Sequence, residues 1–301
     1  MCNLGFFIPQ RDSFLHCQLL SMYKLRCLMN RDVNILYPAL SSLAKGHQTD
    51  LNTLAKKSVN NHDNYIGLAD CCHYVFNNRP RRSNIDCINY LTTLNEYIQH
   101  IDPAKKDFIW NQLTKGDKST FLDTLVEASW YLHFTNNGFK VATPVPFYNN
   151  EFQSGDADLV VTRETTEWWL DVYSLGSEKS IFPTNNSSPV IASSKSLDDV
   201  ILEIGRKAIK KFHNKFPSQV RTGKKRLGLL ICIMKREATL LRPLMRAHQN
   251  GLAVHPPPNL FSKNQNGLHI IIVNTLGTLS RSEILQPIVY CTWKREQHNN
   301  I

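Results

Sequence analysis

Apolar residues recur at helical spacing through the first third of the chain, between polar stretches rich in Asn, His and Arg such as 77–82. Because positions three and four apart lie on one face of a helix, this spacing predicts amphipathic helices. Another helix is expected to begin at Asp102-Pro103, with Asp as its cap and Pro in its first turn. The helical spacing covers residues 14–29, 33–43, 65–76 and 85–101.

From residue 120 the pattern predicts one longer helix. Thr120-Phe121-Leu122-Asp123 has the form of a capping box, and the Asn-Asn-Gly sequence at 136–138 is a stop signal. The helix between them would be about 17 residues long, with Glu127 on a face that looks into a cleft. The next segment, 139–148, holds two prolines and predicts an irregular or edge strand. The buried stripe of the helix is expected to consist of Leu122, Leu125, Ser129 and Leu132.

Two apolar strand-like segments, 155–161 and 168–173, each carry a carboxylate, Asp158 in the first and Asp171 in the second. A carboxylate in so apolar a run is costly to bury unless it is paired or holds a cation. Two carboxylates on neighbouring strands are the ligands that a magnesium-class cation prefers. The sequence therefore predicts a metal-dependent phosphodiester site. In the simpler alternative, Asp158 lies in a hairpin turn and Asp171 on a solvent-facing side of its strand.

Alternation along these strands predicts which side chains lie together. Side chains at positions i and i+2 share a face of a strand, and position i+1 points the other way. Asp158 and Val160 would share a face of the first strand. In the second strand one face would hold Trp168, Leu170 and Val172, and the other would hold Trp169, Asp171 and Tyr173.

Further elements are expected downstream. A capping box at Ser196-Leu197-Asp198-Asp199 predicts a second helix. Apolar runs predict buried strands over 227–234 and 268–273, and 238–249 has helical spacing. The buried stripe of the helix after Ser196 is expected to hold Leu197, Ile201, Ile204 and Ala208.

This order of helix, strand, two Asp-bearing strands, basic helix and strand resembles the PD-(D/E)XK nuclease superfamily over residues 117–235. That superfamily includes many restriction enzymes, Holliday-junction resolvases and DNA-repair nucleases. In the comparison Asp158 matches the aspartate of the PD half-motif, and Asp171 matches the acidic residue of the (D/E)XK half-motif. Glu127 matches the glutamate often found on the first core helix. The resemblance implies that Glu127, Asp158 and Asp171 hold Mg²⁺ or Mn²⁺.

The resemblance also implies a fold. It is an α/β fold with a restriction-endonuclease-like core, in which helices flank a mixed central sheet, and here an N-terminal helical region precedes it. We expect residues 1–115 to form that helical region and residues 116–301 to form the nuclease core with a C-terminal extension. The helical region offers a surface for a protein partner, for nucleic acid or for covering the sheet.

The sequence departs from the family motif at Tyr173, which stands at the position of the motif lysine. In the family that lysine is thought to orient the attacking water and to stabilise developing negative charge. A neutral phenol with a pKa of about 10 does this less well. Lys207 on the next helix is the replacement that we consider first, with Lys179 in the preceding loop as a second. The alternative for Lys207 is an ordinary exposed i,i+4 pair with Glu203.

Positive charge is concentrated in one block of the chain. The formal net charge is +10, and residues 206–226 hold nine Lys or Arg and no Asp or Glu. Such a block can contact several phosphates and supply salt-sensitive affinity for nucleic acid, with DNA as the expected partner. The alternative is a solvated helix face in a basic protein. The phosphate contacts are expected from Lys210, Lys211, Lys215, Lys224, Lys225 and Arg226.

Composition narrows the classes of protein to which this chain could belong. The chain has 301 residues, of which 42% are hydrophobic, so it can bury a substantial core. Its eight cysteines show no CxxC pair, which gives no support to a disulfide framework or a zinc module, and Cys71 and Cys72 are expected to be buried in a helix. No targeting or membrane segment is visible in the sequence, so we expect a cytoplasmic protein without a membrane partner.

These observations favour a metal-dependent nuclease that acts on DNA, with Glu127, Asp158, Asp171, Tyr173 and Lys207 as its catalytic residues. The sequence shows no Gly-rich phosphate loop, GxSxG elbow or HExxH motif. A catalytically inactive member of the fold that binds nucleic acid or a protein partner is the main alternative, and Tyr173 favours it. A third is an interaction module in which the helical half carries the function.

Overall fold

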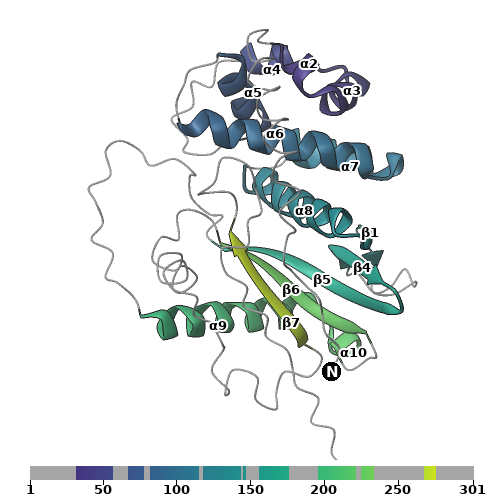
Figure 1. The fold of residues 1–301 in the computed structure, drawn as a ribbon, viewed down its shortest axis with the longest axis vertical. Coiled ribbons are helices and arrows are strands. Elements are labelled where there is room, and N and C mark those ends of the chain that lie inside the picture. The colour runs from purple at the N-terminus through teal and green to yellow at the C-terminus, as the bar shows by residue number, and fades with distance from the viewer. Residues whose placement is uncertain are drawn as a thin grey trace, which may run out of the picture.

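The computed structural model describes the residues 32–56, 67–77, 82–114, 118–143, 145–146, 156–175, 196–221, 225–233 and 268–275. They form a stack of helices over one face of a mixed β-sheet, with helix α9 (Leu197–Lys215) over the other face (Figure 1). The expected mixed α/β class is therefore confirmed. The helices predicted over 14–29 and 238–249, as well as Lys179 and Lys224, lie outside the described residues.

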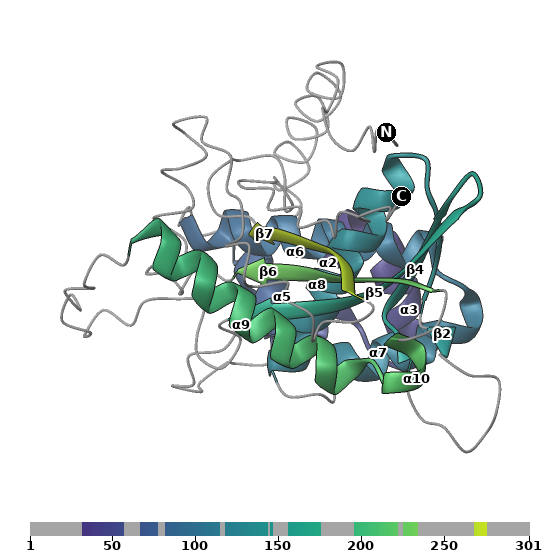
Figure 2. The ribbon, with the colours of Figure 1, turned by 90° about the horizontal axis from the view of Figure 1, so that it is seen from below.

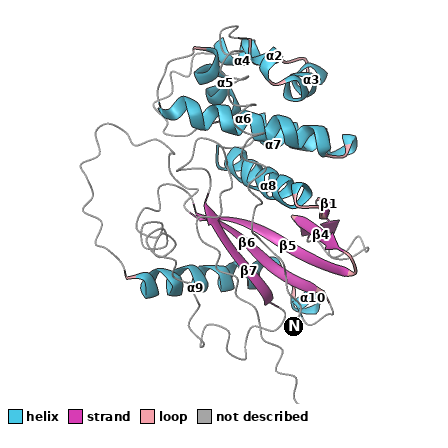
Figure 3. Ribbon diagram, viewed as in Figure 1, coloured by secondary structure: helices cyan, strands magenta, loops and turns pink. Residues whose placement is uncertain are grey.

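The described residues before 115 are mainly helical (Figure 3). The single helix predicted over 33–43 is wrong, because the chain breaks at Tyr37 into two helices. Proline disfavours helical backbone in the residue before it, and Tyr37, which precedes Pro38, has φ −129° and ψ 71°. Asp102 is a cap as predicted, since its Oδ1 accepts a hydrogen bond of 2.9 Å from the Ala104 N–H. The helical elements are α2 (Val33–Leu36), α3 (Pro38–Gly46), α4 (Leu51–Lys56), α5 (Leu68–Phe76), α6 (Arg82–His100), the 3₁₀ helix η2 (Pro103–Lys105) and α7 (Lys106–Thr114).

Helix α8 (Lys118–Asn136) connects this helical stack to the sheet. It begins two residues before the predicted capping box, so that prediction is wrong: a cap needs extended backbone, and Thr120 is helical. The predicted end is confirmed, because Gly138 has φ +78° and the Phe139 N–H donates to the Phe134 carbonyl at 3.0 Å. The helix is buried on most of its surface because it lies between α6, α7 and the sheet. The predicted stripe of Leu122, Leu125, Ser129 and Leu132 is buried.

Within the part of the chain that the structure describes, the central sheet has five strands in the order β1-β4-β5-β6-β7. Strand β4 is antiparallel to both of its neighbours, β1 and β5. Strand β6 is parallel to both of its neighbours, β5 and β7. The chain passes from β5 to β6 through α9 and the short helix α10 (Ser218–Arg221). A separate strand pair is formed by β2 (Val145–Pro146) and β3 (Asp156–Ala157). The sheet strands are β1 (Lys140–Ala142), β4 (Leu159–Arg163), β5 (Thr166–Leu175), β6 (Arg226–Ile233) and β7 (Leu268–Thr275).

The predicted alternation along β5 is confirmed. Leu170 is buried in the hydrophobic core that contains α8, and Trp168 and Val172 pack against the same core. Asp171 and Tyr173 face the other way, toward the lysines of α9. Helix α9 crosses this second face of the sheet (Figure 2). The edge position predicted for 139–148 is confirmed by β1, which forms one edge of the sheet.

The helical stack and the sheet share one buried hydrophobic cluster. It extends from Val33 in α2 through α5, α6 and α8 to Leu159, Leu170 and Leu230 in the sheet. Cys71 and Cys72 are free thiols buried in α5, as predicted. Among the described residues, no helix is long and apolar enough to cross a bilayer.

Candidate active site

The two predicted carboxylates meet where β4 and β5 lie side by side. Asp158 is in the bend between β3 and β4, and its Oδ2 accepts a hydrogen bond of 2.7 Å from the Val172 N–H of β5. Asp158 was predicted to lie in the same strand as Val160 and to share a face with it. It lies instead in the bend just before that strand, which is β4. Asp171 is in the middle of β5, and its side chain is 0% exposed. The alternative with Asp171 on a solvent-facing side is wrong, because α9 covers that face.

Lys215, in the last turn of α9, joins the two carboxylates. Its Nζ lies 2.8 Å from Oδ1 of Asp158 and 3.1 Å from Oδ1 of Asp171. The more exposed Asp156 lies 3.8 Å from the same ammonium. Oδ1 and Oδ2 of Asp171 are buried and accept no hydrogen bond from the described residues, so Lys215 acts on Asp171 as an ion pair. One ammonium thus lies between the two carboxylates and pairs with both.

Lys211 lies one helical turn before Lys215 and brings a second positive charge. Its Nζ lies 3.9 Å from Oδ2 of Asp171 and 5.3 Å from the centroid of the Tyr173 ring. Residues four apart share a face of a helix, so α9 presents both lysines to the sheet. Tyr173 thus lies beside an ammonium that comes from the helix.

The local sequence explains why α9 forms and why its basic side faces this place. Ser196 caps the helix as predicted, since its Oγ accepts a hydrogen bond of 3.1 Å from the Asp199 N–H. Of the residues predicted to form the buried stripe of this helix, Ile204 and Ala208 are buried. The side chains of Leu197 and Ile201 are not among those that the structure describes. Because this stripe holds α9 against the sheet, the lysines at four-residue spacing are fixed at one edge of the contact. The buried stripe consists of Val200, Ile204, Ala208 and Phe212.

Glu127 on α8 belongs to the same electrostatic cluster. Burial, and then the negative charges of Asp158 and Asp123, raise the pKa of Glu127 to about 8. Burial and the Asp158 charge raise the pKa of Asp171 to about 8, against the opposing effect of Lys215 and Lys211. Burial on its own would lower the pKa of Lys215, but Asp171 and Asp158 outweigh it and raise that pKa above its usual value. Lys215 is therefore charged at neutral pH. Glu127 and Asp171, with pKa values of about 8, bind protons at neutral pH.

A metal ion would find two suitable ligands here. Mg²⁺ is commonly held by one or two carboxylates, with water and substrate phosphate completing its shell. Asp171 fits this requirement because both of its oxygens are buried beside cations, with Lys215 at 3.1 Å and Lys211 at 3.9 Å, and Asp158 directs Oδ1 to the same point. No group of three His, Cys, Asp or Glu is arranged to hold a metal within the described ranges. Asp158 and Asp171 therefore fit as direct ligands.

The structure places the other predicted residues at different points. Lys207 forms the i,i+4 ion pair with Glu203 that was the alternative to a catalytic role, with its Nζ 2.9 Å from Oε1 of Glu203. Lys210 is exposed on α9. Lys225 lies over the Trp169 ring, 3.1 Å from its centroid. Arg226 lies over the Trp168 ring at 5.6 Å.

Lys215 is a site residue for which the sequence predicted another role. It was predicted to contact phosphate, and Lys207 was considered as the replacement for the motif lysine. Lys207, Lys211 and Lys215 share one face of α9 at four-residue spacing, so the sequence did carry a signal for all three. What it lacked was the position of the helix along the strands, which decides which of the three reaches Asp171.

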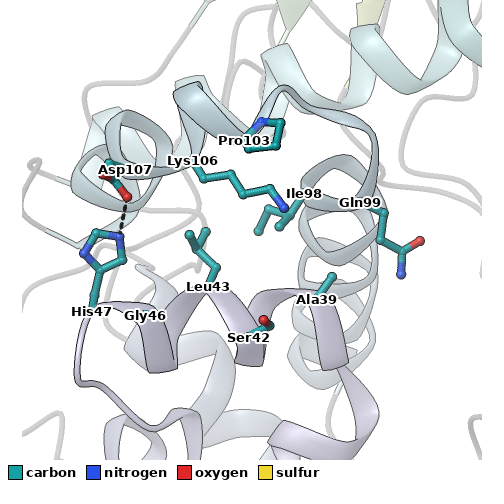
Figure 4. A pocket seen from close by; sticks show the side chains of 10 residues that line it. All are labelled: Ala39, Ser42, Leu43, Gly46, His47, Ile98, Gln99, Pro103, Lys106 and Asp107. Carbon is teal, nitrogen blue, oxygen red and sulfur yellow. Dashed lines mark ion pairs between the residues drawn. The ribbon is translucent and has the colours of Figure 1, made fainter.

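A separate cavity lies in the helical stack, at α3, α6 and α7 (Figure 4). Its volume is about 430 Å³, and Lys106 extends across it toward Ile98. His47 stacks on Trp110 with ring centroids 5.4 Å apart, and its Nε2 lies 3.2 Å from Oδ1 of Asp107. None of the residues predicted to be catalytic lines this cavity.

Comparisons of this chain with protein-family models, with curated proteins and with solved structures found no match.

Proposed function

We propose that this protein is a metal-dependent nuclease that hydrolyses phosphodiester bonds in DNA. The observation that carries the proposal is the cluster of Asp158, Asp171 and Lys215 between the sheet and α9. Two carboxylates that fit a divalent cation, beside a lysine that stays charged, are the parts that phosphodiester hydrolysis needs. In this proposal Lys215 takes the role that the motif lysine has in the family.

The order of elements supports a restriction-endonuclease-like core. The chain runs through α8, β1, β4, β5, α9 and β6, which is the order of helix, strand, two Asp-bearing strands, basic helix and strand on which the resemblance rests. Asp158 directly precedes the second of these strands, Asp171 lies on the third, and Glu127 lies on the first helix. The sequence motif and the strand order thus favour the same core.

Each residue has a separate task in this proposal. Asp158 and Asp171 bind Mg²⁺ or Mn²⁺, and Glu127 binds it through water. When bound, the metal activates the attacking water and stabilises the charge of the reacting phosphate. Lys215 donates to a phosphate oxygen, and its raised pKa keeps it protonated while it does so. Lys211, between Asp171 and Tyr173, adds positive charge to the same wall of the site.

Basic residues around the site supply the affinity for DNA. Arg206 and Lys210 are exposed on α9, and Arg226 is exposed at the start of β6. Such charges bind phosphate without regard to base sequence and weaken as salt rises. Arg206 and Lys210 belong to the same helix as Lys211 and Lys215, so a phosphate bound to them is held near that helix.

The proposal is tested by incubating the purified protein with supercoiled and with single-stranded DNA in Mg²⁺ and in Mn²⁺. We expect the wild type to nick or cut DNA, and the double variant Asp158→Asn/Asp171→Asn to be inactive. Lys215→Gln should also be inactive, whereas Lys207→Gln should keep most of the activity because Lys207 pairs with Glu203. Absence of cleavage by the wild type in both metals would rule the proposal out.

The second candidate is a catalytically inactive protein of the same fold that binds nucleic acid. Lys215 favours it, because its ammonium already neutralises the carboxylates in the structure. Such a protein binds DNA equally well in EDTA and in Mg²⁺, and its affinity falls with salt. Equal binding in both solutions together with no cleavage would therefore support this candidate.

A further inference from the structure

We infer that the Lys215 ammonium and the metal compete for the same oxygens of Asp158 and Asp171, so that DNA raises the affinity for metal by drawing Lys215 onto a phosphate. The inference rests on the proposed function, and it adds the condition under which the site binds its metal. In the free protein Lys215 blocks the metal. With DNA bound, the carboxylates are released and the metal enters.

The competition follows from the distances in the cluster. Nζ of Lys215 lies 2.8 Å from Oδ1 of Asp158 and 3.1 Å from Oδ1 of Asp171. A Mg²⁺ ion that used the same two oxygens would lie about 2.1 Å from each, within the space that the ammonium occupies. Two cations at so short a separation repel each other strongly, above all where burial reduces solvent screening. Binding of the metal therefore requires Lys215 to leave.

Lys215 has a path out of the cluster. Asp171 at its inner side is fully buried, but the Asp156 side chain at 3.8 Å is 51% exposed. The Lys215 side chain itself is 23% exposed, so its ammonium is at the border between the buried carboxylates and the solvent. A phosphate that approaches from the Asp156 side meets the ammonium directly.

DNA supplies the partner that replaces the carboxylates. Charge-assisted hydrogen bonds from lysine to phosphate are about as strong as those from lysine to carboxylate. Lys210 and Arg206 on the exposed side of α9 attract the backbone to this region. Once Lys215 turns to a phosphate, the two carboxylates lack a cation, and a buried carboxylate without a partner is costly. Metal binding then removes that cost.

Linkage makes the effect reciprocal: if DNA tightens metal binding, metal tightens DNA binding by the same factor. Couplings of this kind typically amount to about 5-fold to 150-fold. A lysine that had only a structural role would give no coupling.

The test measures Mn²⁺ binding by electron paramagnetic resonance at about pH 8, where protons compete less for the carboxylates. Each protein is titrated alone and with an oligonucleotide whose phosphorothioate linkages resist cleavage, and Mn²⁺ bound by the oligonucleotide alone is subtracted. The proteins are the wild type, Lys215→Gln and Lys45→Gln. Lys215→Gln keeps a hydrogen-bond donor for the carboxylates without the charge. Lys45→Gln removes the same charge from an exposed position of α3, outside the proposed site.

We expect the oligonucleotide to tighten Mn²⁺ binding to the wild type by about 5-fold or more. Lys215→Gln should bind Mn²⁺ more tightly than the wild type without the oligonucleotide, and the oligonucleotide should change its affinity by less than about 2-fold. Lys45→Gln should behave as the wild type does, both with Mn²⁺ alone and with the oligonucleotide. Circular dichroism verifies that each variant is folded.

The outcomes separate this inference from the proposed function. If the wild type and Lys215→Gln bind Mn²⁺ equally tightly, with or without the oligonucleotide, the competition is wrong although the metal site stands. If no protein binds Mn²⁺ under any condition, the metal site is wrong and the inference falls with it. Should Lys215→Gln fail to fold, the absence of any effect of the oligonucleotide on the wild type would still overturn the inference.

Discussion

At the scale of single residues, the site depends on one lysine that neutralises buried acid groups. Asp171 is fully buried, and the ammonium of Lys215 approaches it to 3.1 Å. A buried ion pair adds little net stability compared with an apolar pair, but removal of one partner leaves an uncompensated charge. Lys215 is therefore required for stability as well as for the proposed chemistry.

Replacement of Lys215 by Met should lower the free energy of unfolding by about 3 kcal/mol at about pH 9, above the pKa of about 8 of Asp171, where that carboxyl is ionised. Loss of the ammonium leaves Asp158 and Asp171 without the cation that balances them. Urea denaturation followed by circular dichroism measures the change. Lys210→Met, which removes a charge from an exposed position, should change the free energy by less than about 0.5 kcal/mol. Equal effects of the two substitutions would contradict the role of Lys215.

Glu127 and Asp171 should make the protein less stable as pH rises. Their pKa values are about 8 in the folded protein, against ordinary values of 4.5 and 3.8. Between these limits the folded state binds more protons than the unfolded state, so the free energy of unfolding falls as pH increases. Below the ordinary values, and above about pH 8, these two groups give no further change.

The variant Glu127→Gln tests this assignment. It removes one of the two groups, so the decrease in the free energy of unfolding between about pH 5 and pH 8 should become smaller. Urea denaturation at several pH values across that interval measures the slope for the wild type and the variant. Glu167→Gln, which changes an exposed glutamate of β5, is the matched control and should leave the slope unchanged. An unchanged slope in Glu127→Gln would place the proton uptake elsewhere.

At the scale of elements, local signals predicted most of the structure near the site. The stop at Gly138, the cap at Ser196 and the alternation along β5 were all readable, because each depends on residues close together in the sequence. The break at Tyr37 was missed although Pro38 explains it, because the apolar spacing continues through both residues. The start of α8 was also missed, because a sequence that matches a capping box can equally be accommodated inside a helix.

The cap of α9 should contribute measurably to stability. Oγ of Ser196 accepts a hydrogen bond from the Asp199 N–H, and loss of such a cap costs about 1 kcal/mol. Ser196→Ala should therefore lower the free energy of unfolding by that amount in urea denaturation. Ser42→Ala, at an exposed position inside α3, should leave it unchanged or raise it slightly, since Ala is the better helix former. A neutral result at Ser196 would mean that α9 does not depend on its cap.

At the scale of the whole molecule, the sequence predicted the two carboxylates of the site but not the lysine that contacts them. Lys207 and Lys215 are eight residues apart in α9, which corresponds to about 12 Å along a helix. The lysine that reaches Asp171 is chosen by how far α9 is shifted along β5 and β6, and that shift is fixed by packing between segments distant in the sequence. A local pattern therefore identified the correct face of the helix but not the correct turn.

The helical stack and the sheet should unfold together, because one buried cluster connects them through α8. Trp110 lies in the stack, Trp130 lies in α8, and Trp168 and Trp169 lie in the sheet, so variants that lack one group or the other weight the tryptophan fluorescence toward one part. In one variant Trp110 and Trp130 are replaced by Phe, and in the other Trp168 and Trp169 are. Since a shared core transmits the loss of either part to the other, each variant should show a single urea transition with the same midpoint by fluorescence and by circular dichroism. Two transitions at different urea concentrations would instead mean that residues before about 115 fold as a domain of their own, and that α8 belongs to the sheet alone.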